Sequence, residues 1–385
     1  MKANPGGTIA PAEVMGRDKL ILDLWGILEQ QSVILSAERR MGKTSVIKKM
    51  QAEASAKPST DKLPIYRDLE GIKSPLAFVE KVFEDVEKYL TGLNRNAKKA
   101  RAFLTQLGGT EFSGVKLPSI ANTHWQDLLT QTIADLVENQ DRTVIFFWDE
   151  MPYMLGNIGD AAAMDLLDTL RYIRQTYPAV RMVYTGSIGL HHVLNVLRKA
   201  GYTNDPINDM YIQDVPPLSD KDATNLARKL LEGENIATPD IQGSAVLIAD
   251  ELSNIPFYIH HLIVKLKLRG GAADKAGIEE VIADCLDDPL NPWKMEHYRE
   301  RVDTYYDEKQ RPYALNLLDI LAAAGDYLSF DELFAGIKQE SETQDKEMAR
   351  KVLRLLEQDY YLYKKDGRYQ FRYPLIKKYW KSLRC

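Results

Sequence analysis

One segment near the N-terminus limits the possible folds more than any other. An apolar run at residues 32–35 leads directly into Ser-Ala-Glu-Arg-Arg-Met-Gly-Lys-Thr-Ser at residues 36–45, which is the pattern of a buried strand, a phosphate-binding loop and a helix. In such a loop the backbone N–H groups point at a phosphate, the lysine reaches the terminal phosphate oxygens, and the next hydroxyl ligates Mg²⁺. Lys43 and Thr44 occupy those two positions. The segment therefore predicts a nucleoside triphosphate as the ligand.

The loop departs from the pattern Gly-x-x-x-x-Gly-Lys-Ser/Thr at its first position, where Ala37 replaces glycine. An alanine there must turn at a negative φ or carry some strain. A chance Gly-Lys-Thr in a surface turn is the alternative, so partner residues are needed elsewhere in the chain. The residues expected to contact the nucleotide in or directly after the loop are Ala37, Arg39, Arg40, Met41, Gly42, Lys43, Thr44 and Ser45.

A partner motif lies at residues 143–150, where an apolar and β-branched run ends in the adjacent carboxylates Asp149 and Glu150. A buried parallel strand has no polar face, and ligands bind at its carboxyl end. We therefore expect Asp149 to ligate Mg²⁺ together with Thr44. Glu150 is expected to polarise the attacking water as the general base of hydrolysis. An ordinary strand end with solvated acids is the alternative, and the preceding loop disfavours it.

A third strand is predicted at residues 180–184, directly before Thr185-Gly186-Ser187. A hydroxyl at that carboxyl end can orient the attacking water or contact the γ-phosphate. Ser187 is thus expected to complete the catalytic group with Lys43 and Glu150, and Thr185 is the other candidate for its role. Capping of the helix that starts near Ile188 is an alternative that does not exclude this role.

The composition indicates a globular protein of two or three modules, because 385 residues with 45% apolar side chains exceed one ordinary core. The N-terminus lacks the apolar stretch of a secretory signal, and the longest apolar runs stop at about six residues, too short to span a membrane. A cytoplasmic location is therefore expected. The two cysteines, Cys285 and Cys385, are far apart in sequence, which indicates neither a disulfide framework nor a zinc site.

Adjacent histidines occur twice, at residues 191–192 and 260–261. Neighbouring side chains on a helix point about 100° apart, so we interpret both pairs as packing or capping residues rather than as a chelating site.

Charge is distributed unevenly along the chain. The net charge is −5, but residues 351–385 contain ten Lys or Arg against three acids. An acidic body with a basic end indicates one surface that faces a polyanion.

Three modules are expected from the order of patterns. Residues 1–215 alternate strands and helices and predict an α/β core with a parallel sheet, interrupted by an insertion of unknown role at residues 91–124. Residues 216–285 carry only helical patterns and predict a lid. Ser219 to Asp222 form a capping box before an apolar stripe at residues 223–231, Thr238-Pro239 caps another helix, and Asn254-Ile255-Pro256 opens the last helix. Pro256 could pack on adenine there, although a proline in a first helical turn needs no such role.

Residues 293–385 predict a winged helix: three helices, a hairpin around Asp366-Gly367, and a final helix. The helix at residues 346–358 takes the recognition position, and Lys364, Lys365 and Arg368 lie on the wing. DNA binding is one interpretation. Protein–protein or lid function is the other, because acids on the same helix repel phosphate.

Taken with these pieces, the chain resembles the STAND-like branch of the AAA+ P-loop ATPases of archaea and bacteria, relatives of the origin-recognition ATPases. The resemblance covers nearly the whole chain and implies an ATPase core, a helical lid and a C-terminal winged helix, with ATP and Mg²⁺ as cofactors. The segments that carry it are Gly16-Arg17-Asp18, the loop at residues 38–45, Asp68-Leu69-Glu70, Trp148-Asp149-Glu150, Thr185-Gly186-Ser187 and Phe371-Arg372-Tyr373-Pro374-Leu375-Ile376.

The chain departs from the family pattern at three places. Ala37 replaces the loop glycine, Asn254 stands where the lid motif Gly-x-Pro has glycine, and residues 205–210 lack the arginine often placed before the lid. The missing arginine implies slow hydrolysis, because that charge stabilises the transition state in related ATPases. Arg198 is a candidate substitute.

The sequence thus favours an ATP-binding molecular switch with slow Mg²⁺-dependent hydrolysis that repositions the lid and the winged helix. The alternative is an ATP-dependent DNA-binding or DNA-loading ATPase that uses the basic C-terminal module. A third hypothesis is a nucleotide-binding scaffold for a partner protein encoded elsewhere. The expected partners are ATP or ADP, and either a partner protein or further copies of the chain in a homo-oligomer.

Overall fold

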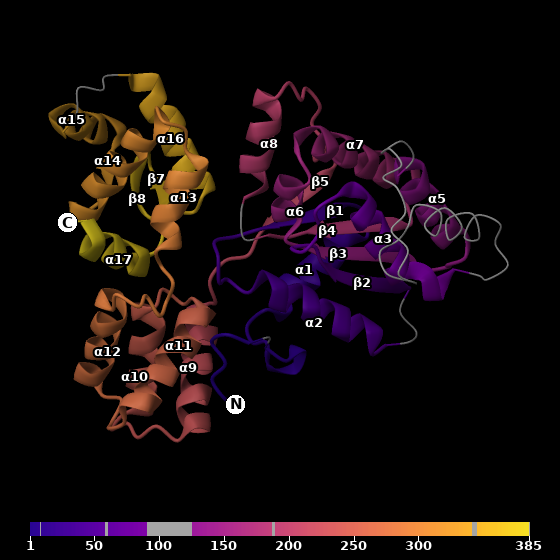
Figure 1. Cartoon of the computed structure of the whole chain (residues 1–385). Helices are drawn as coiled ribbons and strands as arrows, with labels where there is room; N and C mark the ends of the chain where they lie inside the picture. The colour runs from indigo at the N-terminus through magenta and orange to yellow at the C-terminus, as the bar shows by residue number, and fades with distance from the viewer. Residues whose placement is uncertain (8, 58–60, 91–124, 187–188, 341–344, 385) are drawn as a thin grey trace, which may run out of the picture. The chain divides into compact units, whose positions relative to one another are not determined.

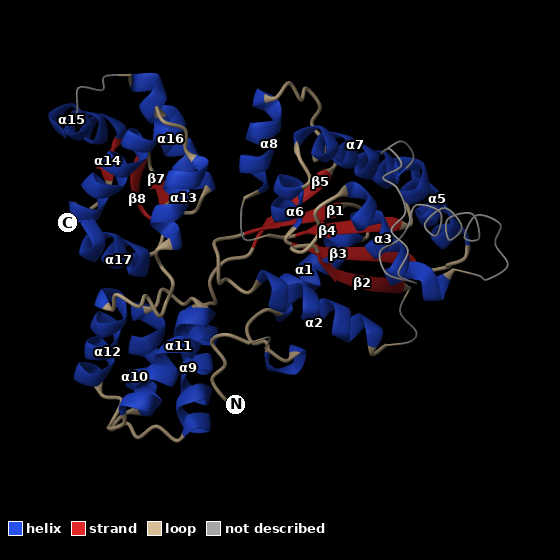
Figure 2. Cartoon of the chain, in the orientation of Figure 1, coloured by secondary structure: helices blue, strands red, loops and turns tan. Residues whose placement is uncertain are grey.

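The computed structural model of the protein describes residues 1–7, 9–57, 61–90, 125–186, 189–340 and 345–384. The predicted insertion at residues 91–124 and the predicted catalytic residue Ser187 lie outside them. The backbone divides into two compact units. Unit 1 comprises Met1–Ile9, Ala37–Gly42 and Pro216–Cys385, whereas unit 2 comprises Ala10–Ser36 and Lys43–Val215. Figure 1 traces the chain, and Figure 2 distinguishes its helices and strands.

Unit 2 is built on the parallel sheet that its sequence predicts. Among the described residues, five strands lie in the order β2, β3, β4, β1, β5, and neighbouring strands are parallel. The strand order changes direction at β1, because the chain passes from β1 to the distant β2 and later returns to place β5 on the other side of β1. Ligands bind at such a switch point, beyond the carboxyl ends of the strands. The strands are β1 (Ser32–Ser36), β2 (Lys62–Asp68), β3 (Thr143–Asp149), β4 (Val180–Tyr184) and β5 (Met210–Asp214).

The helices of unit 2 cover both faces of this sheet. They are α1 (Asp18–Leu28), α2 (Lys43–Ser55), α3 (Pro75–Val86), α5 (Trp125–Glu138), α6 (Met151–Asn157), α7 (Asp160–Thr176) and α8 (Leu190–Lys199), with 3₁₀ turns at Pro11–Glu13 and Glu87–Tyr89. Phe147 on β3 meets Trp25 of α1 edge to face, whereas its neighbour Trp148 meets Phe78 of α3. Successive strand residues point to opposite faces, so α1 and α3 lie on opposite sides of β3.

The first half of unit 1 after residue 216 is helical. Its helices are α9 (Asp220–Glu234), α10 (Ile241–Glu251), α11 (Pro256–Arg269) and α12 (Lys275–Asp287). Ser219 caps α9 by accepting the N–H of Asp222, as predicted. The helix expected after Thr238-Pro239 begins later, because Asp240 is the residue that caps α10.

The second half of unit 1 contains helices and a small antiparallel sheet in the described residues. The elements are α13 (His297–Tyr305), α14 (Gln310–Ala323), β6 (Leu328–Ser329), α15 (Phe330–Glu340), α16 (Lys346–Gln358), β7 (Leu362–Lys365), β8 (Arg368–Phe371) and α17 (Pro374–Arg384). β7 and β8 form the predicted hairpin, and its turn residues Asp366 and Gly367 have φ of 49° and 78°. Asp-Gly suits this turn because both central residues need positive φ.

Among the residues that the structure describes, every helix is too short or too polar to cross a membrane.

Candidate functional site

The phosphate loop leaves the carboxyl end of β1 and leads into α2. Arg40 and Gly42 have left-handed backbones, with φ of 70° and 89°, whereas Ala37 turns at a negative φ. Because α2 begins at Lys43, the backbone N–H groups of its first turn have no carbonyl partner within the helix. Turned loop N–H groups next to a helix N-terminus form a concave site for an anion. The local backbone is therefore suited to hold a phosphate group.

Asp149, the last residue of β3, is the centre of a hydrogen-bonded group in unit 2. Thr44 Oγ1 donates to its Oδ2 at 2.6 Å, and Thr185 Oγ1 donates to its Oδ1 at 2.7 Å. The backbone N–H of Glu150 also donates to Oδ1, at 3.2 Å, and the Tyr66 hydroxyl lies 3.4 Å from Oδ2. Asp149 is only 3% exposed. Four donors from four parts of the chain thus hold this carboxylate in one orientation.

The oxygen atoms of this group fit a magnesium ion. Mg²⁺ prefers oxygen ligands, and it is commonly held by one or two protein oxygens together with phosphates and waters. The Thr44 hydroxyl and the Asp149 carboxylate supply such a pair at 2.6 Å. Thr44 also follows the loop lysine directly in sequence, which joins the metal ligands to the phosphate loop. Both residues predicted as metal ligands are therefore brought together.

Glu150 has a left-handed backbone with φ of 57° and immediately precedes α6. A non-glycine residue in this conformation is uncommon, and here it turns the chain sharply at the end of β3. The turn places Glu150 directly next to the Asp149 carboxylate along the chain. Glu150 thus directly follows the candidate metal ligand at the carboxyl edge of the sheet, and its role as general base stays a prediction.

The other predicted site residues occupy several places. Ser45 lies in the first turn of α2, and the side chain of Lys43, the first residue of α2, is buried. Pro256 is the first residue of α11 in unit 1, the ordinary position for a proline that starts a helix. Arg198 is exposed in the last turn of α8. The packing of adenine on Pro256 and the role of Arg198 stay predictions.

Tyr66 is a member of the Asp149 group that sequence reasoning missed. Burial raises the pKa of its hydroxyl, and the nearby Asp149 carboxylate raises it further, so Tyr66 remains a neutral donor. The signal was indirect, because Tyr66 precedes the end of β2 by two residues and only the pairing of β2 with β3 brings it near Asp149. Thr185, the other candidate for the role of Ser187, donates its hydroxyl to Asp149 Oδ1.

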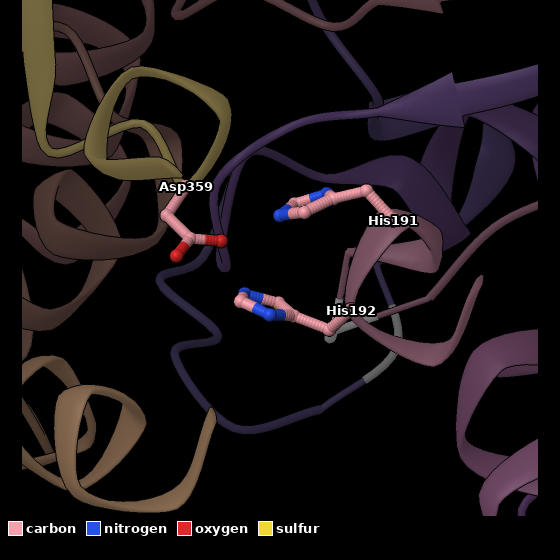
Figure 3. Close-up of side chains that lie close together, drawn as sticks. All are labelled: His191, His192 and Asp359. Atoms are coloured by element: carbon pink, nitrogen blue, oxygen red, sulfur yellow. The ribbon is translucent and has the colours of Figure 1, made fainter. Parts of the chain in front are cut away.

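The paired histidines of α8 lie closer together than their sequence predicts. The ring centroids of His191 and His192 are 4.3 Å apart (Figure 3), so the expectation that the two rings diverge is wrong for this pair. Asp359, also labelled in Figure 3, belongs to unit 1, where it accepts a hydrogen bond from the Tyr306 hydroxyl at 2.6 Å. Two imidazoles on one helix are fewer ligands than a structural metal ion takes, and we assign no metal to them.

Comparison with solved structures identifies the fold. The Walker-type ATPase paby2304 of Pyrococcus abyssi matches with a TM-score of 0.67 and 15% sequence identity, over 99% of this chain and 100% of that chain. The fold is that of a P-loop ATPase. The ORC2 protein of Aeropyrum pernix, solved in ADPNP–ADP complexes, matches with a TM-score of 0.57 and 11% identity, over 98% of this chain and 96% of that chain. No protein-family model matches the chain, and no curated protein matches its sequence.

Proposed function

We propose that the protein is an ATP-binding molecular switch of the AAA+ class that hydrolyses ATP slowly with Mg²⁺. The observation that carries this proposal is the hydrogen bond between Thr44 and Asp149, 2.6 Å long, next to a turned loop at the switch point of a parallel sheet. An isolated Gly-Lys-Thr turn has no reason to meet a buried carboxylate at the end of another strand. Similarity in fold to a Walker-type ATPase and to a protein solved with ADPNP and ADP supports the same ligand.

The proposed roles follow from chemistry and position. Loop N–H groups and Lys43 hold the β- and γ-phosphates, while Thr44 and Asp149 hold Mg²⁺, which would neutralise phosphate charge. Glu150 polarises the attacking water. Thr185 and Ser187 are the candidates for reading the γ-phosphate. Exchange of the bound nucleotide then repositions a helical lid at residues 216–285 and a winged helix at residues 293–385, in the manner of a STAND-like ATPase.

Slow turnover is part of the proposal. The segment at residues 205–210 carries no arginine, and an arginine that contacts the γ-phosphate contributes several orders of magnitude to the rate in other P-loop enzymes. A partner protein or a second copy of this chain could supply the missing charge. Arg198 is exposed at the end of α8 and could serve the same purpose for another copy.

The decisive experiment measures ATP binding and hydrolysis by the wild-type protein and by two site variants. Lys43→Ala is expected to abolish measurable ATP binding. Glu150→Gln is expected to keep ATP affinity within a few-fold while losing hydrolysis by about a hundredfold or more, because only the general base is removed. Lys19→Ala, an exposed lysine on α1 of the same unit, is the matched control and should behave as wild type. Wild-type turnover by Glu150→Gln would remove Glu150 from its role, and full ATP binding by Lys43→Ala would sink the proposal.

A second function is favoured by one feature of unit 1. Lys351 and Arg354 on α16 and Lys364 and Lys365 on β7 are all exposed, which gives the predicted recognition helix and wing a basic surface. Such a surface can engage the phosphates of duplex DNA. In that case ATP would control DNA binding or loading. Acids on the same helix are partly neutralised, since Glu347 pairs with Arg350.

A further inference from the structure

The phosphate loop contains an acidic side chain that is held in a buried ion pair. Glu38, the second residue of the loop, is 1% exposed. Arg301 of α13 binds it with two hydrogen bonds, from Nη2 to Oε1 at 2.6 Å and from Nη1 to Oε2 at 3.0 Å. Both residues belong to unit 1. This two-pronged geometry is the strong form of an arginine–carboxylate contact.

Glu38 is charged in spite of its burial. Burial alone would raise the pKa of its carboxyl group, but the Arg301 guanidinium and the nearby His297 imidazole outweigh that effect and lower the pKa to about 2. His297 lies one turn before Arg301 on α13, with Nε2 3.7 Å from Glu38 Oε1. A negative charge therefore sits permanently in a loop whose expected ligand is also negative.

Arg301 also contacts the segment between α16 and β7, in the same unit as the loop. Its Nη1 also donates to the backbone carbonyl of Asp359 at 2.8 Å. Asp359 ends α16 and precedes β7, and its carboxylate is fixed by the Tyr306 hydroxyl. One guanidinium thus binds both the phosphate loop and the corner between α16 and β7, which Figure 1 labels in the orange and yellow part of the chain.

A second loop residue is anchored in the same unit. The guanidinium carbon of Arg40 lies 3.8 Å from the ring centroid of Phe257, in the first turn of α11. Arg40 has a left-handed backbone, so its side chain leaves the loop in a direction that an ordinary extended residue would not give. Ser36 and Lys43, which flank the loop, belong to unit 2. The side chains of Glu38 and Arg40 are therefore both held by residues of unit 1.

We infer that Arg301 is a positioning residue for the phosphate loop, and that the Glu38–Arg301 pair couples nucleotide binding to the corner between α16 and β7. This inference rests on the proposed function. Without Arg301, the Glu38 carboxylate is released inside a phosphate-binding loop and repels the nucleotide. Coupling between two sites is reciprocal, so a nucleotide that shifts the loop must also shift the Arg301 contact with Asp359.

The test is a double-mutant cycle on the full chain with Mg·ATP as the ligand. Arg301→Met removes the charge at similar volume, and it is expected to weaken ATP binding by about tenfold or more through one unscreened carboxylate. Glu38→Gln alone should change affinity by only a few-fold. The double variant, which carries neither charge, should recover most of the wild-type affinity. Arg299→Met is the matched control, because Arg299 pairs with Asp303 on the exposed side of the same helix.

Removing one partner of a buried ion pair also destabilises a fold, and removing both can restore it. The free energy of unfolding of each variant is therefore measured as well, and affinities are compared under conditions in which every variant is folded. The second measurement is amide hydrogen exchange at residues 355–365 with and without saturating ATP. The wild-type protein should show a change in exchange rate at these residues when ATP binds. Arg301→Met, measured at an ATP concentration that saturates it, should show no such change. If Arg301→Met does not fold, Arg301→Lys is the replacement variant. Lysine keeps the positive charge but cannot make both hydrogen bonds to Glu38, so an ATP affinity between those of wild type and Arg301→Met is expected.

The outcomes distinguish the two claims. If wild type binds no ATP, the proposed function fails and the inference with it. If wild type binds ATP but Arg301→Met binds it equally well and keeps the exchange response, the inference alone is overturned. Additive losses in the cycle would also overturn it.

Discussion

The two oxygens of Thr44 and Asp149 that share a hydrogen bond are both candidate metal ligands, and this sets a prediction at the scale of single residues. Thr44→Ser keeps the hydroxyl and should retain Mg²⁺-dependent ATP binding. Thr44→Ala removes one ligand and is expected to raise the Mg²⁺ concentration needed for half-maximal ATP binding by about tenfold or more. Substitution of residues that support a metal site has effects of this size on metal affinity. Titration of Mg²⁺ at fixed ATP measures the difference.

Thr169→Ala is the matched control for this titration. Thr169 lies on α7 in the same unit, and its hydroxyl donates to the backbone carbonyl of Asp165 in its own helix at 2.7 Å. It should leave the Mg²⁺ requirement unchanged. Equal Mg²⁺ requirements for Thr44→Ala and wild type would mean that Asp149 holds the ion without Thr44.

Residues of the candidate site differ in how far the sequence could reveal them. Lys43, Thr44 and Asp149 stand at fixed offsets from the ends of predicted strands, so their convergence follows from parallel pairing alone. Glu38 and Arg301 are 263 positions apart, and nothing local in either segment marks them as partners. An acid in a phosphate loop was the available hint, because a charge there needs a counter-charge.

Elements of unit 1 carry the second candidate function, and the basic hairpin makes it testable. Replacing Lys364, Lys365 and Arg368 with alanine should weaken binding to a DNA duplex and lower the slope of log affinity against log salt by about two to three, if each side chain neutralises one phosphate. Arg368 pairs with Glu332 in an exposed position, and such pairs contribute little to stability. The folded state should therefore survive the change.

A triple variant of exposed lysines on α9 and at the start of α12 controls for net charge; its positions are Lys221, Lys229 and Lys275. It should leave the salt slope at the wild-type value. Equal losses in both triple variants would indicate nonspecific attraction, and absence of duplex binding by wild type would leave the switch without a DNA partner.

Helices and strands could be predicted from the sequence where their apolar residues follow a regular pattern. β3 is apolar throughout and α9 has both a cap and a stripe, and both were predicted within a few residues. β5 was missed because it is an edge strand, with Tyr211 and Ile212 exposed by 45% and 60%, and its short sequence lacks the apolar run of a buried strand. α13 was missed since it is short and follows a linker rich in Asp and Pro.

At the scale of the whole molecule, the chain was expected to fold as consecutive modules along the sequence, and that division stays a prediction. The α/β class with a parallel sheet is confirmed. The grouping of residues 1–9 and 37–42 with the C-terminal half could not be predicted, because it depends on contacts between distant segments. Lys2 and Ala3 bond to residues of α9, and the Asn4 N–H donates to His260 on α11.

These contacts predict how unit 1 responds to acid. Burial lowers the pKa of His260 to about 4, and burial together with nearby cations such as Arg40 lowers that of His261 to about 4. The unfolded chain has histidines with a pKa near 6.5, so it binds more protons than the folded chain between these values. Stability is thus fully present above pH 6.5 and falls as the pH drops towards 4, by on the order of 2–4 kcal/mol for the pair.

Glu38 adds a second loss of stability, in a lower pH range. Its folded pKa of about 2 lies below the value of about 4.3 in the unfolded chain, so its contribution is lost only as the pH falls through that lower range. Unit 1 should therefore lose stability in two steps. Denaturant unfolding at intervals between pH 7 and 2 measures both, and the variant with asparagine at residues 260 and 261 should remove the first step while keeping the second, because asparagine can still accept the Asn4 N–H. A wild-type stability that stays flat from pH 6.5 to 4.5 would contradict the neutral, hydrogen-bonded state of His260 and the anchoring of the N-terminal segment that depends on it.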